Sequence, residues 1–169
     1  MCGIKCLKES EKSIAMIKLV TQWNIMQATV IHSESWKDSH RDICSAEFIA
    51  LHTPERQRGY LESEMAKGAQ LYMLIDEKPV GIVSVCGNLI ENLYVLPSEQ
   101  NKGYGTQLLT FAIGKCTDSP SLWVLSTNDG AQRFYTRHGF QPTGKIVQHP
   151  GGVYELELSL VSEMANRKV

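Results

Sequence analysis

The chain has no excess of charge of either sign. Its 17 Lys and Arg side chains are balanced by 18 Asp and Glu, a formal net charge of −1 over 169 residues. Proteins whose main work is to grip nucleic acid along a basic face carry a clear positive excess. The composition therefore argues against nucleic acid as a partner, and ligands have to be inferred from local groups of residues.

Long hydrophobic runs and paired cysteines are also missing. No apolar run approaches the ~20 residues of a membrane span, so no membrane partner is expected. Residues 1–6 lack the apolar region of a secretory signal. The cysteines form no CxxC pair and no zinc-finger spacing with a histidine, so no metal site is expected. We expect a cytoplasmic protein with free thiols, several of them buried, at Cys2, Cys6, Cys44, Cys86 and Cys116.

No linker, internal repeat or low-complexity tract divides the chain. Its length suits one domain, and a composition of 43% hydrophobic and 21% charged residues is that of an ordinary soluble protein. We therefore expect a single domain over residues 1–169.

The hydrophobic periodicity predicts an α/β protein. Strands are expected at residues 13–19, 70–75, 80–86, 89–96, 121–126, 140–147 and 152–160. Helices are expected at residues 23–36, 54–67, 105–116 and 129–138, with a short one near 45–49. The three strands from residue 70 to residue 96 should form an antiparallel meander, with a hairpin turn at Gly87 and Asn88. The helix that follows them implies a crossover to a parallel neighbour at 121–126.

A strand, a glycine-rich loop and a helix follow one another between residues 89 and 116. In this arrangement backbone N–H groups and the helix dipole face an anion, and Lys102 can add a positive charge at the rim. A Rossmann fingerprint would need glycine where the sequence has Leu108, and the Gly-Lys-Ser/Thr of a P-loop is absent. Both nucleotide-binding classes are therefore disfavoured. By itself the loop is equally consistent with a structural helix start.

Two motifs carry a family resemblance. Residues 93–97 (Leu-Tyr-Val-Leu-Pro) and 100–105 (Gln-Asn-Lys-Gly-Tyr-Gly) resemble the signature of the GNAT superfamily of acyl-CoA-dependent N-acetyltransferases, a hydrophobic strand end followed by Gln/Arg-x-x-Gly-x-Gly/Ala. Residues 128–140 resemble its Asn-x-x-Ala-x-x-Phe/Leu-Tyr-x-x-x-Gly-Phe helix, and Ser35-Trp36 with residues 47–49 resembles a common bacterial branch. The resemblance covers nearly the whole chain. It implies a mixed, mostly antiparallel central sheet of about six to seven strands, flanked by helices on both faces.

The resemblance also implies acetyl-CoA as the cosubstrate. In such proteins the central strand bulges and splays from its parallel neighbour, and the pantetheine arm pairs as a pseudo-strand with the backbone of Leu93, Tyr94 and Val95. Asn128 would contact the cofactor from the next helix. The loop would wrap the pyrophosphate with Gln100, Asn101, Lys102, Gly103, Tyr104, Gly105 and Thr106. Residues 89–140 would thus form the cofactor side, and residues 1–70 the acceptor side.

Glu91 and Tyr135 are the candidate catalytic residues. Glu91 lies two residues before Leu93 and is expected to share a strand face with Leu89, Leu93 and Val95. Apolar neighbours would raise its pKa and suit it to accept a proton from an amine, directly or through water. Its alternative role is a solvated carboxylate at a strand edge. By resemblance, Tyr135 would protonate the departing thiolate; its alternative role is packing between helix and sheet.

The acceptor side is less defined. His32, Trp36 and His40 could line a substrate pocket formed by the N-terminal helices, but the helical spacing of Ile25, Thr29, His32 and Trp36 equally predicts a core-facing stripe. Arg133 and Arg137 could meet cofactor phosphates or be solvated. His138 is expected to be structural, at a helix C-terminus.

These features predict an enzyme that acetylates a primary amine of a small molecule, peptide or protein. The alternatives are a CoA-binding sensor without catalysis and a toxin-like acetylase of aminoacyl-tRNA, which the neutral charge does not favour. The acceptor and the oligomeric state stay open, although homodimers are frequent among such proteins.

Overall fold

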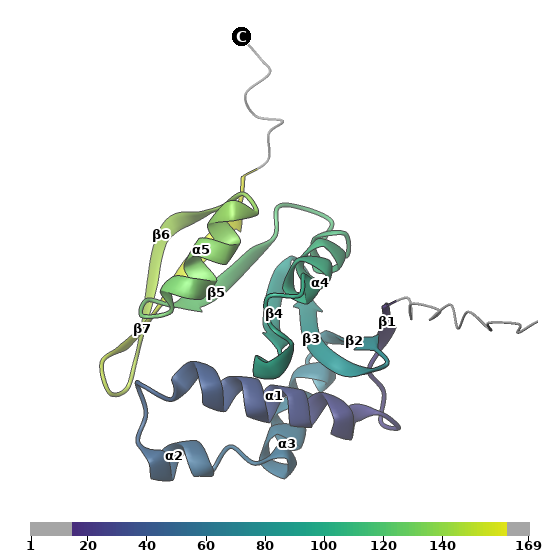
Figure 1. Cartoon of the computed structure of the whole chain (residues 1–169). Coiled ribbons are helices and arrows are strands. Elements are labelled where there is room, and N and C mark those ends of the chain that lie inside the picture. The colour runs from purple at the N-terminus through teal and green to yellow at the C-terminus, as the bar shows by residue number, and fades with distance from the viewer. Residues whose placement is uncertain (1–14, 162–169) are drawn as a thin grey trace, which may run out of the picture.

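The computed structural model describes residues 15–161, and its centre is one seven-stranded sheet in the order β1-β2-β3-β4-β5-β7-β6 (Figure 1). The strands are β1 (Met16–Leu19), β2 (Gln70–Asp76), β3 (Lys78–Cys86), β4 (Leu89–Val95), β5 (Ser121–Leu125), β6 (Phe140–His149) and β7 (Val153–Leu160). The helices are α1 (Ile25–His40), α2 (Ala46–Ala50), α3 (Pro54–Ala66), α4 (Tyr104–Ile113) and α5 (Asp129–Arg137), with a 3-10 turn η1 (Pro97–Glu99). The start of the first predicted strand, like Cys2 and Cys6, lies outside the described residues.

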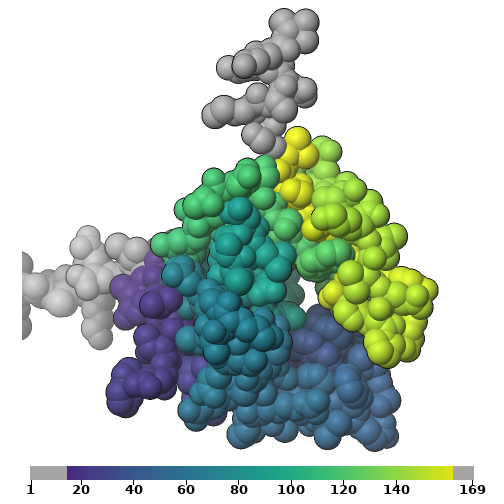
Figure 2. All heavy atoms as spheres, turned by 180° about the vertical axis from the view of Figure 1, so that it is seen from behind, coloured from purple at the N-terminus to yellow at the C-terminus, as the bar shows by residue number. Residues whose placement is uncertain are grey.

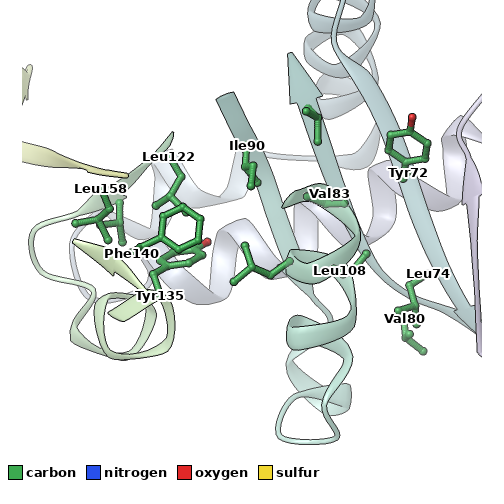
Figure 3. Close-up of a cluster of buried hydrophobic side chains, with 14 residues drawn as sticks. Tyr72, Leu74, Val80, Val83, Ile90, Leu108, Leu122, Tyr135, Phe140 and Leu158 are labelled. Carbon is green, nitrogen blue, oxygen red and sulfur yellow. The ribbon is translucent and has the colours of Figure 1, made fainter. Parts of the chain in front are cut away.

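Helices cover both faces of the sheet, as expected. Against one face, α1 and α3 bury a cluster that includes Ile25, Ile31 and Leu61. Against the other face, α4 and α5 bury a larger cluster, in which Leu108 and Tyr135 meet side chains from β2 to β7 (Figure 3). The sheet is mostly antiparallel, and its parallel pair, β4 with β5, follows the predicted crossover.

Some boundaries differ from the predicted ones for local reasons. Helix α1 continues past Trp36 to His40, and α4 ends at Ile113. Strand β3 begins at Lys78, because Glu77 adopts a left-handed conformation (φ 59°) that tightens the turn from β2. The hairpin at Gly87 is confirmed, with Cys86 paired to Leu89. Three of the cysteines are free, as expected, but half-buried rather than buried: Cys44, Cys86 and Cys116.

Strand β4 contains one residue more than its partner β3 between two paired positions. Glu91 pairs with Ser84 and Tyr94 with Ile82, so three steps along β4 match two along β3. The extra residue lies at Asn92, whose φ of 47° is left-handed. A bulge of this kind bends a strand and redirects its side chains.

Among residues 15–161, no helix combines the length and the hydropathy needed to cross a membrane.

Candidate functional site

Strands β4 and β5 separate soon after they meet. Only Leu89 and Ser121 are paired, and the two strands then diverge (Figure 1). The opening is part of a cleft of about 1190 Å³, lined by β4, β5, the loop before α4, the first turns of α5, and by α1 and α3. From behind, the surface is hollowed between the teal central strands and the yellow-green β6–β7 hairpin (Figure 2). The bulge and the splaying expected from the resemblance are both present.

The N-terminus of α4 opens on this cleft without a side-chain cap. Its N-cap is Gly103, in a left-handed conformation with φ 86°. By contrast, the side chains of Ser45, Thr53 and Asn128 cap α2, α3 and α5. The first N–H groups of a helix have no partner within the helix, so those of α4 are available to an anion, and the helix dipole favours negative charge there.

Glu99 anchors the loop that leads into α4. The residue is 7% exposed, and its carboxylate lies 2.8 Å from the Lys78 ammonium and 2.7 Å from that of Lys102. Hydrogen bonds from Lys102 and then Lys78 lower the pKa of this carboxyl group. The Lys102 ammonium is therefore part of an ion pair rather than an isolated charge at the rim. Sequence reasoning missed Glu99, although its spacing of three residues from Lys102 was a usable signal.

Of the residues predicted to hold the cofactor, all except Lys102 line the cleft. The carbonyl of Val95 accepts hydrogen bonds from Ser35 Oγ at 3.2 Å and from Gln100 Nε2 at 3.3 Å, so both its lone pairs are occupied. The Tyr104 hydroxyl donates to Asp76 on β2; this raises the pKa of Tyr104 to about 12. Asn128 Oδ1 accepts from the Ala131 N–H at 3.0 Å and so caps α5.

Glu91 does not share a face with Leu93 and Val95, and that expectation is wrong. Leu93 and Val95 pack against the cluster beneath α4, whereas Glu91 pairs with Ser84 on the face covered by α1 and α3. The bulge at Asn92 reverses the alternation of side chains after Glu91.

The environment of Glu91 suits a proton acceptor. The side chain is half-buried and lines the cleft, and its Oε2 is buried without a hydrogen-bond partner among the described residues. Burial, and then the charge of Glu64, raise the pKa of the carboxyl group, while Lys67 opposes them. Glu91 is therefore neither at an edge of the sheet nor fully solvated.

Tyr135 lies on α5 at the opposite side of the cleft. Its ring packs against Phe140 with a centroid distance of 6.0 Å, and its hydroxyl is at the end of the ring that faces the strand carrying Ile90 (Figure 3). The residue is 9% exposed and lines the cleft. Burial raises the pKa of the Tyr135 hydroxyl to about 12, so the group keeps its proton at neutral pH. It thus combines a packing role with access to the cleft.

Three aromatic rings from α1 and the segment after α2 form a stack at the acceptor end. The Trp36 ring lies between those of His52 and His40, with centroid distances of 3.5 and 3.8 Å and interplanar angles of 7° and 11°. All three residues line the cleft. Both faces of Trp36 are covered, so this side chain can meet a ligand only with its edge. Burial lowers the pKa of His40.

His32 belongs to the buried stripe of α1 and to the cleft as well. Like Ile25 and Thr29 it is almost fully buried, at 3% exposed, yet it lines the cleft beside Tyr60 and Tyr94. Burial is the largest cause that lowers the pKa of His32 to about 4. His32 therefore belongs both to the core stripe and to the wall of the cleft, and its part in binding a substrate stays a prediction.

The remaining basic candidates divide between the cleft and the surface. Arg137 lines the cleft, whereas Arg133 is exposed outside it. His138 joins two helices, with Nδ1 2.8 Å from the Phe134 carbonyl on α5 and Nε2 3.2 Å from Thr106 Oγ1 on α4. This geometry agrees with a structural role. Within the described part of the chain, no group of three or more His, Cys, Asp and Glu side chains could hold a metal ion.

Comparisons with known proteins point to one family. Residues 67–142 match the family model of the acetyltransferase (GNAT) domain. The PaiA N-acetyltransferase of Thermoplasma acidophilum, solved in complex with coenzyme A, is 20% identical with a TM-score of 0.64, over 86% of this chain and 99% of that one.

Two further solved structures share the fold. A GCN5-related N-acetyltransferase of Rhodopseudomonas palustris is 18% identical with a TM-score of 0.70, over 89% of this chain and 98% of that one. The ribosomal-protein-S18-alanine N-acetyltransferase of Escherichia coli is 18% identical with a TM-score of 0.66, over 92% and 99%. These structures share the fold of this chain, in agreement with the bulged β4, the cleft and the uncapped α4, and residues 67–142 match the model of the GNAT acetyltransferase domain.

Proposed function

We propose that the protein transfers the acetyl group of acetyl-CoA to a primary amine of a small molecule, peptide or protein. One observation carries this proposal. The uncapped N-terminus of α4 and the unpaired part of β4 open on the same cleft as the Glu91 carboxylate and the Tyr135 hydroxyl. A site for a phosphate-bearing cosubstrate and two groups able to move protons therefore share one space. The coenzyme A complex of the PaiA enzyme supports acetyl-CoA as the cosubstrate.

The α4 N-terminus would hold the pyrophosphate. The free N–H groups of its first turn, with those of the preceding loop from Gln100 to Gly103, would donate to the phosphate oxygens, and the left-handed Gly103 lets the backbone approach closely. The pantetheine arm would run along Leu93 and Tyr94. At Val95, a hydrogen bond to the carbonyl would have to replace the one from Ser35 or from Gln100.

Deprotonation of the amine is the larger chemical demand. An alkyl ammonium with a pKa near 10.4 costs about 4–5 kcal/mol to deprotonate at pH 7. Glu91 would take this proton, directly or through one water, and its raised pKa brings it closer to the pH at which a base is most effective. The free amine then attacks the thioester carbon and forms the C–N bond, with a backbone N–H of β4 stabilising the oxyanion.

Tyr135 would act at the other end of the reaction. As the tetrahedral intermediate collapses, the C–S bond breaks and the thiolate takes the phenolic proton. The attached nitrogen gives up its second proton to solvent, which leaves a neutral amide, and solvent returns a proton to Tyr135. The pKa of about 12 keeps Tyr135 protonated until that moment. Because a thiol has a pKa near 8.5, the thiolate leaves readily, and protonation by Tyr135 contributes less to the rate than deprotonation of the amine.

A screen of amines, amino acids and peptides, with release of free CoA as the readout, tests the activity. With a proven acceptor, Glu91→Gln and Tyr135→Phe should each lower kcat by about 10²-fold or more. Glu62→Gln and Tyr72→Phe are the matched controls. Glu62 is an exposed partner of Arg58 on α3, and Tyr72 donates to Gln70 away from the cleft. Both controls should turn over like the wild type.

Two results would contradict the proposal. Unchanged turnover in both Glu91→Gln and Tyr135→Phe would remove these residues from the mechanism. If no acceptor consumes acetyl-CoA while CoA still raises the melting temperature, the chain is a CoA-binding sensor instead.

A further inference from the structure

The bulge residue Asn92 connects three elements of the acceptor wall through its side chain. Its Nδ2 donates to Ser84 Oγ on β3 at 3.1 Å. Its Oδ1 accepts from the Tyr60 hydroxyl on α3 at 3.4 Å and lies 3.1 Å from His32 Nε2 on α1. The backbone of Asn92 is left-handed, a conformation that Asn tolerates better than most residues. One side chain thus holds β3, α1 and α3 against the strand that carries Glu91.

This network decides which nitrogen of His32 carries a proton. Since Asn92 directs its Nδ2 to Ser84, its Oδ1 faces His32 and requires a donor there. A neutral imidazole has one N–H, so the proton sits on Nε2 and the Nδ1 lone pair is free. The lowered pKa of His32 agrees with a neutral ring.

Two residues attached to Asn92 therefore each carry a proton acceptor without a partner. Among the described residues, His32 Nδ1 and Glu91 Oε2 are the buried side-chain polar atoms that lack a hydrogen bond. Glu91 precedes Asn92 in the chain, and His32 is hydrogen-bonded to Asn92. Both residues line the cleft. Buried acceptors of this kind are costly unless a donor meets them, and an amine nitrogen brings several N–H donors.

We propose that Asn92 is the positioning residue of the acceptor site: it fixes His32 in its Nε2–H tautomer and holds this ring, and the adjoining Glu91 of β4, in the wall of the cleft, where their unpartnered lone pairs would accept hydrogen bonds from the incoming amine. This inference rests on the proposed function, because it assigns the acceptor-binding wall of that same reaction. Asn92 takes no proton itself and acts through His32 and Glu91.

The first test is independent of turnover. In ¹⁵N-labelled wild-type protein, NMR of the histidine rings should show His32 neutral and protonated on Nε2 at pH 7. In Asn92→Gly, which suits the left-handed backbone but lacks the amide, this tautomer preference should be lost. A wild-type His32 protonated on Nδ1 would overturn the inference, whether or not an acceptor is known.

The second test separates the two substrates. With a proven amine, Asn92→Gly should lower kcat/KM for the amine by about 10- to 100-fold, as loss of alignment does, while the KM for acetyl-CoA stays within about twofold of the wild type. Asn88→Gly is the matched control. Asn88 also anchors a segment by its side chain, to the N–H groups of Thr117 and Asp118, but away from the cleft. Asn88→Gly should lower the thermal stability and leave the KM for the amine unchanged.

Two kinetic outcomes would overturn the inference: an Asn92→Gly enzyme with wild-type amine kinetics, or one whose KM rises equally for both substrates. Absence of turnover in the wild type would instead contradict the proposed function, and the NMR result would still decide the tautomer.

Discussion

Gly81→Ala tests how closely β3 and β4 approach beneath α4. A Cβ at Gly81 would lie 2.8 Å from Leu108 Cδ1 and 2.9 Å from the Tyr94 carbonyl oxygen. Both distances are shorter than real Cβ contacts. Leu108 is fully buried, and the Tyr94 oxygen belongs to the backbone of β4, so neither can yield freely. Overpacking of this kind costs about 1–3 kcal/mol.

The expected fall in Tm follows from this loss of stability. For a chain of this length about 2 kcal/mol corresponds to a fall in Tm of about 4–8 °C. Displacement of the Tyr94 carbonyl should also raise the KM for acetyl-CoA, because this part of β4 borders the cleft. Thermal unfolding followed by circular dichroism measures the first effect, and initial rates measure the second.

The same substitution at Gly59 is the control, with the opposite sign. Gly59 lies within α3, and its Cβ would meet nothing within 4 Å. Alanine is the better helix former, so Gly59→Ala should stabilise the protein by about 0.5–1 kcal/mol. If Gly81→Ala melts within about 1 °C of the wild type while Gly59→Ala behaves as expected, the close approach at Gly81 is not as tight as the structure shows.

Three further perturbations have outcomes that follow from the structure. The pKa of His32 is 6.5 in the unfolded chain and about 4 in the folded protein, so the stability linked to it is present above pH 6.5 and is lost as the pH falls toward 4. The free energy of unfolding should fall by about 3 kcal/mol over this range. Urea unfolding at several pH values should show a smaller fall in His32→Gln. Burial raises the pKa of Glu91, so the stability linked to this group is present at low pH and is lost as the pH rises through the pKa of the folded protein. At pH 8, Glu91→Gln should therefore have a Tm equal to or above that of the wild type, although it is less active. A lower Tm at pH 8 would refute the burial argument. Asn128→Ala removes the cap of α5 and should lower the free energy of unfolding by about 1 kcal/mol. Asn128→Asp keeps an acceptor for the Ala131 N–H, so it should melt close to the wild type when both variants are followed by thermal unfolding.

The sequence predicted the order of the elements because their signals are local. The periodicity, the Gly87-Asn88 turn and the change from strand to helix after Pro97 each need only a few neighbouring residues, and the structure confirms all three. The motifs at residues 93–105 and 128–140 predicted a GNAT acetyltransferase, and the family model over residues 67–142 confirms it. The catalytic roles of Glu91 and Tyr135 stay predictions.

The bulge at Asn92 shows where local reasoning fails. Alternation along a strand assigns faces on the assumption of an unbroken ladder, and one inserted residue reverses every later position. Unbroken alternation therefore predicts that Glu91 shares a face with Leu93 and Val95, although it lies on the opposite face. Asn is a poor strand former, which was a weak sign of this irregularity.

The sequence by itself determined the elements, their connection and the family, since these depend on residue types at fixed spacing. Only the tertiary structure decided the partners of single polar groups: Lys102 with Glu99, His32 with Asn92, and the two histidine rings that cover Trp36. Such partners come from segments far apart in the chain, and their burial, which sets the pKa of His32 and of Glu91, exists only once α1 and α3 pack on the sheet.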